Sequence, residues 1–312
     1  MLANTLDFSI HVIGPVVILL ALGKILFAKN VISSEFVSAG SRLVFSFALP
    51  ALLFMSISQA DFAQAANSRL IGTGLIVTLA FFLACLLFVQ WAFSCREDRG
   101  VIVQGSFRAN LGVIGLAYAA NSFSPADFAQ ASVYMGALIL LYNVLSVWVL
   151  NAYLPQRANT IQTLKAMATN PIMLSIVCAL IVAYFKLSLP QIVTASTDYL
   201  AQLTLPLALI CTGASIRFRD MKGQLSALLF SAISKCLLYP LIMIMSGIYI
   251  GMDQTELLTM LFMSVAPTAA VSFIMVKQMG GNADLAANIV ALSTVISVPI
   301  TLLGYQWVIL LG

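Results

Sequence analysis

Long apolar runs separated by short polar segments cover almost the whole chain. Each run is close to the roughly 20 residues that an α-helix needs to cross the hydrocarbon core of a bilayer. The runs are continuous and lack the alternation of membrane β-strands, so the pattern predicts an all-α membrane protein. We expect ten transmembrane helices, at about 7–27, 35–57, 69–93, 101–120, 130–153, 171–186, 196–216, 225–249, 256–277 and 286–310.

The longest polar stretch between these helices divides the chain into two halves. Residues 1–153 and 171–312 each hold five predicted helices, and residues 154–170 form a predicted cytoplasmic linker. Shifting the sequence by 156 residues, half its length, brings Pro50 onto Pro206 and the helix pattern into register. We interpret this as an internal duplication. Because five is odd, the second half would insert upside down, which gives the 5+5 inverted repeat of secondary transporters.

Composition supports a membrane protein and excludes several other classes. Hydrophobic residues make up 61% of the chain and charged residues only 8%, whereas an ordinary soluble domain carries about 25% charged residues. A soluble enzyme, a nucleic-acid binder, a coiled coil and a disordered chain are therefore excluded. The sequence predicts no nucleic-acid partner, and the lipid bilayer is the expected environment.

The basic residues orient the predicted helices, because cytoplasmic loops are enriched in lysine and arginine. With the N-terminus outside, only Arg69 and Lys186 fall on outer helix ends. Both termini are therefore expected on the non-cytoplasmic side of the inner membrane, in a multi-pass protein. The inner positions are Lys24, Lys29, Arg42, Arg96, Arg99, Arg157, Lys165, Arg217, Arg219, Lys222 and Lys277.

Two basic residues remain within predicted helices: Arg108 in the fourth and Lys235 in the eighth. A charge inside a membrane helix is costly and normally marks function. No acidic residue lies near the middle of a predicted helix, so an anionic substrate would supply the missing charge. Alternatively, Arg108 snorkels toward the inner face. Lys235 either neutralises the negative C-terminal ends of broken half-helices or contacts substrate directly.

The fourth and ninth helices are predicted to be broken at corresponding places. Asn110 and Gly112 loosen the fourth, while Pro267, followed by Thr268 and Ser272, interrupts the ninth. Opened backbone at membrane depth is tolerated where it lines a cavity or is buried in protein. Paired interrupted helices are a sequence signal of a transport site. The alternative interpretation is that kinks and small residues only allow close helix packing.

Other polar residues give weaker signals. Pro50 and Pro206 are candidate hinges, with static bends as the alternative, and Asn143 and Asp198 are weak candidates for cation coordination. No phosphate-binding glycine loop, catalytic triad or metal-ligand cluster is present. We therefore expect no enzyme activity and no cofactor or metal, with coupling to protons or sodium left open.

Five segments together resemble the auxin efflux carrier family, in its bacterial branch, over nearly the whole chain. They are "LVFSFALPALLF" from Leu43, "FRANLGVIGL" from Phe107, "LTLPLALICTGASI" from Leu203, "SKCLLYPLIM" from Ser234 and "APTAAVSFIMVKQMGGNADLAANIVALSTVIS" from Ala266.

The resemblance implies a fold and a substrate site. Helices 1, 2, 6 and 7 would form a scaffold, helices 3–5 and 8–10 a transport unit, and helices four and nine would cross at the substrate. The family's helix-four asparagine and helix-nine proline correspond to Asn110 and Pro267. The asparagine that plant members carry after this proline is not matched, because Ala269 and Ala270 lie there. Bile-acid/sodium symporters share the broader architecture, whereas the acidic pair of related antiporters is absent.

The resulting hypothesis is a secondary transporter of small organic anions, carboxylates such as malate or malonate, that works by alternating access. The predicted substrate-binding residues are Arg108, Asn110, Gly112, Pro267, Thr268 and Ser272. Two alternatives stay open: a carrier of another amphipathic anion, similar to the bile-acid/sodium symporters, and a membrane sensor that does not transport. A homodimer through the scaffold helices is also open.

Overall fold

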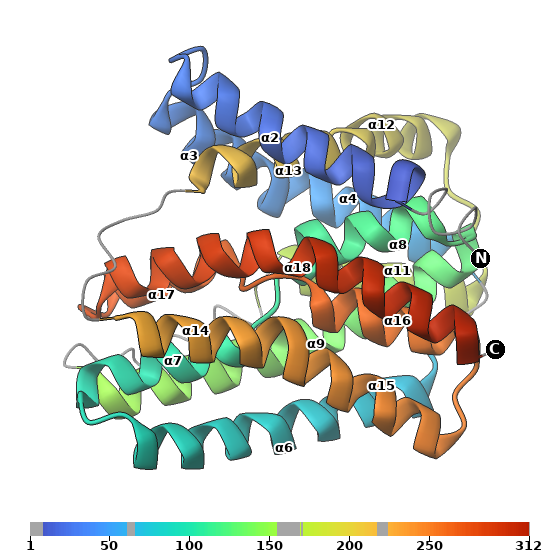
Figure 1. Ribbon diagram of the computed structural model, residues 1–312. Helices are drawn as coiled ribbons and strands as arrows, with labels where there is room; N and C mark the ends of the chain where they lie inside the picture. Colours follow the sequence, from blue (N-terminus) through green and yellow to red (C-terminus); the bar gives the residue numbers. More distant parts are fainter. Residues whose placement is uncertain (1–8, 61–65, 155–168, 170, 217–223, 312) are drawn as a thin grey trace. The chain divides into compact units, whose positions relative to one another are not determined.

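In the computed structural model, the described residues are 9–60, 66–154, 169, 171–216 and 224–311. Of these described residues 86% are helical, and none of them lies in a strand (Figure 1). The predicted linker lies outside the described part except for Leu154 and Thr169, and so do both chain ends. The all-α prediction is confirmed.

Six helical runs in the described part are long and apolar enough to cross a membrane. The other four predicted segments consist of shorter helices. The predicted helices four and nine are each interrupted, as described below. The six runs are His11–Ala28, Ser34–Ser58, Ser68–Ala92, Pro125–Tyr153, Leu225–Ile250 and Ala283–Leu311.

The chain divides into two compact units, of which the first contains Met1–Ser68, Gly112–Ala137 and Leu164–Ser215. Its α-helices and π-helical turns (η) are η1 (Ser9–Ile13), α2 (Gly14–Ala28), α3 (Ser34–Leu43), η2 (Val44–Ala48), α4 (Leu49–Ser58), α8 (Leu116–Ser122), the start of α9 (Pro125–Tyr153), α11 (Pro171–Phe185), α12 (Gln191–Gln202) and α13 (Thr204–Ser215).

Glycines bring α2 and α13 of this unit into close contact. A Cβ added to Gly23 would collide with the carbonyl oxygen of Ile210, and one added to Gly213 would collide with that of Leu20. Each glycine thus faces the backbone of the other helix, as in the small-residue interfaces of membrane helices. This is a packing role that only glycine can fill at both positions.

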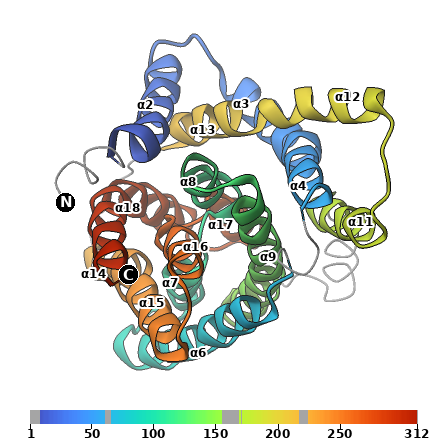
Figure 2. The same ribbon diagram turned by 90° about the vertical axis from the view of Figure 1, so that its right-hand side faces the viewer.

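The second unit contains Arg69–Leu111, Leu138–Thr163 and Ile216–Gly312. Within it α16 packs against α15 and α18, and α7 against α14 and α18 (Figure 2). Its elements are α6 (Ser68–Ala92), α7 (Arg96–Phe107), the rest of α9, α14 (Leu225–Ile233), η4 (Ser234–Leu238), α15 (Tyr239–Ile250), α16 (Gln254–Val265), α17 (Ala270–Gln278) and α18 (Ala283–Leu311).

Proline explains three of the wide π-turns. Turns η1, η2 and η4 each end two residues before a proline, namely Pro15, Pro50 and Pro240. Proline donates no N–H and its ring clashes with the carbonyl four residues earlier, so a regular α-turn is disfavoured there. A π-turn moves that carbonyl away and lets the helix continue with a bend.

The two candidate hinge prolines lie in the first unit. Pro50 is the second residue of α4 and lies inside the continuous helical run Ser34–Ser58, directly after the π-turn η2. Pro206 is the third residue of α13, in a first turn, where proline is well tolerated. These positions are compatible with a static role, and a hinge at either proline stays a prediction.

Candidate functional site

The fourth predicted helix is broken at Arg108. Helix α7 ends at Phe107, Arg108 is extended (φ −76°, ψ 98°), and helical structure resumes at Leu111 in the turn η3 (Leu111–Gly115). The ninth is broken in the same manner between Val265, where α16 ends, and Ala270, where α17 begins. Both interruptions lie where the sequence predicted them.

The two breaks pair with each other through an isolated antiparallel bridge between Ala109 and Thr268. The Asn110 N–H donates to the Pro267 carbonyl at 2.7 Å, and the Ala269 N–H donates to the Arg108 carbonyl at 3.0 Å. Backbone groups that leave a helix must find partners away from water. Here each break supplies the partners of the other, so neither can form its short extended segment alone.

Thr268 fixes this crossing to two further helices. Its N–H donates to the Ser293 hydroxyl of α18 at 3.0 Å, and its own hydroxyl donates to the Gly105 carbonyl of α7 at 2.8 Å. Thr268 is buried, and these bonds use its polar groups structurally. We therefore assign Thr268 to the framework of the crossing and leave its predicted contact with substrate as a prediction.

The Arg108 side chain lies beside the crossing and is only 7% exposed. Its guanidinium donates to the Asn143 side-chain oxygen of α9 at 2.8 Å and to the Met275 sulfur of α17 at 2.8 Å. Both partners are uncharged. Among the described residues, the positive charge of Arg108 therefore has no carboxylate to balance it, and a buried charge without a counter-charge is costly.

Two other predicted site residues near the crossing carry polar groups without a hydrogen bond in the described structure. The Ser272 hydroxyl, at the third position of α17, is 2% exposed and has no partner there. The Asn110 side-chain amide makes no hydrogen bond to any described residue, and Asn110 is buried. A buried polar group without a partner is uncommon, so the Ser272 hydroxyl points to an unfilled role.

Lys235 lies in the π-turn η4 and is fully buried. Its ammonium donates to the Ser264 carbonyl in the last turn of α16 and lies over the Tyr239 ring, 5.0 Å from its centroid. The C-terminal end of a helix carries partial negative charge, which a cation stabilises. Of the two roles considered for Lys235, this geometry fits the structural one, in which the lysine neutralises the C-terminal end of a broken helix.

A chain of hydroxyl groups continues from this lysine. The Tyr239 hydroxyl is 2.7 Å from the Thr78 hydroxyl and 2.8 Å from the Tyr142 hydroxyl. Tyr142 precedes Asn143, the partner of Arg108, on α9. Helix α9 therefore connects the surroundings of the two buried cations.

Three of the residues predicted from the sequence, Gly112, Pro50 and Pro206, lie in the first unit. A Cβ at Gly112 would come within 3.1 Å of a Leu49 side-chain carbon, a tight contact that favours glycine, and a substrate contact at Gly112 stays a prediction. Pro50 and Pro206 belong to the same unit. The structure therefore groups Arg108, Asn110, Pro267, Thr268, Ser272 and Lys235 in one unit, without these three.

Sequence reasoning missed several partners of the site. Met275 and Ser293 carry no signal in the sequence, because a methionine and a serine are ordinary in membrane helices. Asn143 stood out as polar in an apolar run and was a candidate for cation coordination; in the structure its oxygen accepts from the guanidinium cation of Arg108. No group of three or more metal-ligating His, Cys, Asp or Glu side chains occurs among the described residues.

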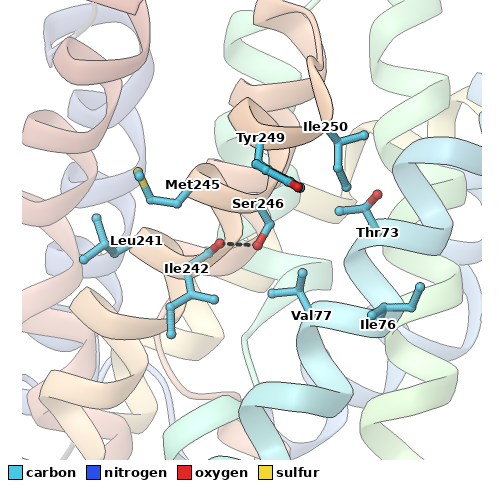
Figure 3. A pocket seen from close by; sticks show the side chains of 9 residues that line it. All are labelled: Thr73, Ile76, Val77, Leu241, Ile242, Met245, Ser246, Tyr249 and Ile250. Carbon is cyan, nitrogen blue, oxygen red and sulfur yellow. Dashed lines mark hydrogen bonds between the residues drawn. The ribbon is translucent and has the colours of Figure 1, made fainter.

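A pocket of about 510 Å³ lies elsewhere, between α6 and α15, and none of the predicted site residues lines it (Figure 3).

Comparison with known proteins agrees with the membrane architecture. Residues 152–305 match the model of a family described as "Membrane transport protein", which contains the auxin efflux carriers. A relative from Rhizobium meliloti (strain 1021), described as "Putative malonate transporter", is 24% identical over 278 residues, which cover 85% of this chain and 84% of that protein. These matches confirm the family resemblance and point to a multi-pass membrane transporter rather than an enzyme.

Proposed function

We propose that this chain, a relative of the auxin efflux carriers, is a secondary transporter of small organic anions, carboxylates such as malate or malonate, across the inner membrane. One observation carries the proposal: the buried guanidinium of Arg108 lies at the paired helix breaks with only uncharged partners among the described residues. A carboxylate substrate would supply the balancing charge and form charge-assisted hydrogen bonds.

The groups around the crossing suit a carboxylate. Arg108 supplies the charge, the Ser272 hydroxyl is a buried donor without a partner in the described structure, and the Asn110 side-chain amide is a further donor beside the crossing. Helix α17 begins here, and the first N–H groups of a helix have no partner within the helix. Such an N-terminus favours anions. Pro267 and Thr268 hold the crossing in shape, and Gly112 follows it in sequence.

Lys235 acts on the protein rather than on the substrate in this proposal. By holding the carbonyl end of α16, it lets a broken helix end inside the protein. It leaves Arg108 as the cation that meets the substrate.

We further propose a ten-span 5+5 inverted repeat, with both termini outside, that works by alternating access. The helical segments found at all ten predicted positions support it. The division into units supports a moving part: one unit holds the predicted scaffold segments together with Gly112–Ala137, and the other holds Arg108, Lys235 and the crossing. Movement of the second unit would expose the site to each side in turn.

Transport in proteoliposomes tests this function. We expect saturable uptake of labelled malonate or malate that unlabelled acid inside the vesicles accelerates by counterflow, and no uptake of an organic cation of similar size. Uptake under imposed proton and sodium gradients identifies the coupling ion. Acid binding without flux would indicate a sensor, and transport of cations alone would overturn the proposal.

A further inference from the structure

A groove opens between α6 and α15 in the second unit, away from the residues of the proposed transport site. Its volume is about 510 Å³, within the range of small-molecule sites in proteins. Thr73 and Ile76 of α6 line one wall, and Met245, Ser246 and Tyr249 of α15 line the other (Figure 3). The Ser246 hydroxyl is bonded to the Ile242 carbonyl of its own helix, so it presents little polarity to the groove.

The two helices are tied together at both ends of this groove. At one end the Arg69 guanidinium donates to the carbonyls of Ile250 and Gly251, where α15 ends. At the other end Thr78 is bonded to the Tyr239 hydroxyl, and the rings of Phe81 and Tyr239 lie 5.0 Å apart. From position 69 to position 78, α6 rises about 13 Å at 1.5 Å per residue. The groove is therefore a bounded trench rather than a general gap.

The chemistry changes along the trench. Its middle is lined by apolar side chains, and Ile76 and Met245 are exposed. At the Arg69 end, Tyr249 is 93% exposed. Tyrosine and arginine are typical of the level where a membrane protein meets lipid headgroups.

The Arg69 guanidinium has further N–H donors that make no hydrogen bond to a described residue. Among the described residues, only one of its terminal nitrogens makes hydrogen bonds, and both acceptors are backbone carbonyls. In the described structure no carboxylate pairs with it, and its side chain is exposed. A guanidinium with free N–H groups is well suited to a phosphate.

The geometry points to a binding site for a phospholipid with an anionic headgroup, whose acyl chain lies in the trench and whose phosphate meets Arg69. An acyl chain matches the apolar, elongated space, and the cation at one end selects the headgroup charge. Arg69 falls on the predicted outer side, so the lipid would belong to the outer leaflet. The site shares no residue with the proposed carboxylate site, and its test requires no transport.

Native mass spectrometry of the purified full chain in detergent tests this site. The probes are palmitoyl-oleoyl phosphatidylglycerol, phosphatidylcholine with the same chains, and glycerol 3-phosphate without chains. We expect wild type to bind phosphatidylglycerol in preference to phosphatidylcholine. Arg69→Ala should weaken phosphatidylglycerol binding about tenfold and largely remove the preference.

A second variant distinguishes the loss of lipid binding from a structural effect of removing Arg69 at the end of α15. Ile76→Trp fills the trench from an exposed position and leaves Arg69 unchanged, so it should weaken the binding of both phospholipids. Arg42→Ala and Leu87→Trp are the matched controls, because Arg42 is an exposed basic residue and Leu87 an exposed apolar residue of α6 outside the groove. Both should bind as wild type does.

Three results would overturn the proposal. Unchanged phosphatidylglycerol binding in both Arg69→Ala and Ile76→Trp would place the lipid elsewhere. Equal binding of glycerol 3-phosphate would identify a small-anion site without an acyl component. A change from dimer to monomer in Ile76→Trp, without a change in lipid binding, would show that a second copy of the chain covers the groove.

Discussion

The N–H of Asn110 donates to the carbonyl oxygen of Pro267 at 2.7 Å, and this bond joins two helix breaks from opposite halves of the chain. A proline cannot donate a backbone hydrogen bond, but its carbonyl can accept one. The residue that interrupts the ninth segment therefore also satisfies the backbone of the fourth. The break at Pro267 and the crossing of the fourth and ninth segments therefore depend on the same backbone groups.

Arg108→Ala should lower carboxylate uptake at least tenfold. Charge-assisted hydrogen bonds contribute about 1.5–3 kcal/mol, which corresponds to about a 10- to 150-fold change in affinity. Stabilisation by the ligand should disappear in this variant as well. With the carboxylate at 100 times its dissociation constant, the free energy of unfolding of wild type should rise by about 2.7 kcal/mol. Arg42→Ala, at an exposed arginine, serves as the control. Normal uptake by Arg108→Ala would remove this residue from the site.

Lys235→Met should raise thermal stability by a few degrees and lower transport. Burying an ammonium without a carboxylate partner lowers the free energy of unfolding by several kcal/mol. The hydrogen bond to the Ser264 carbonyl returns only about 1.5–3 kcal/mol of this. Losing the cation should nevertheless loosen the carbonyl end of α16. Thermal unfolding and uptake are measured beside Lys29→Met, an exposed lysine that should change stability by less than about 0.5 kcal/mol. A lower melting temperature would show that Lys235 is net stabilising.

Ser272→Ala should keep or raise stability while weakening carboxylate binding. Its hydroxyl is buried without a partner in the described structure, and removing such a group relieves up to about 1 kcal/mol. Ser293→Ala is the contrasting variant, because it leaves the buried Thr268 N–H without its acceptor and should destabilise by about 1–3 kcal/mol. Thermal unfolding without and with malonate measures both effects. Full ligand stabilisation in Ser272→Ala would argue against contact with substrate.

Gly213→Ala should destabilise the first unit by about 1–3 kcal/mol, because a Cβ there collides with the rigid Leu20 backbone of α2. Gly72→Ala is the matched control, since nothing lies within 4 Å of its Cβ position. Alanine should stabilise that helix by about 0.8–1 kcal/mol. Chemical unfolding compares the two variants, and equal effects would contradict the close contact of α2 and α13.

Reporter fusions should place both termini on the non-cytoplasmic side. Alkaline phosphatase fused after residue 312 should be active, and a fluorescent protein inserted in residues 154–170 should fluoresce, because the arginines and lysines of the inner loops orient the helices. A fluorescent C-terminal fusion would contradict the count of ten spans.

The apolar runs determined the helical architecture, because each backbone N–H and C=O must be satisfied within its own segment in a membrane. Arg108 and Lys235 stood out because charge within such runs is rare, and Pro267 marked a break because proline removes a helix hydrogen bond and clashes with the preceding turn. These signals depend on local chemistry, so the sequence alone carries them.

Only the tertiary structure decided what these residues contact. The Asn143 and Met275 partners of Arg108, the Ser264 carbonyl beneath Lys235, and the pairing of Ala109 with Thr268 join residues far apart in the chain. An apolar helix can turn any face toward its neighbours, because lipid and protein are almost equally apolar. The sequence by itself therefore determined which residues are exceptional, whereas close packing between distant helices decided which of them meet.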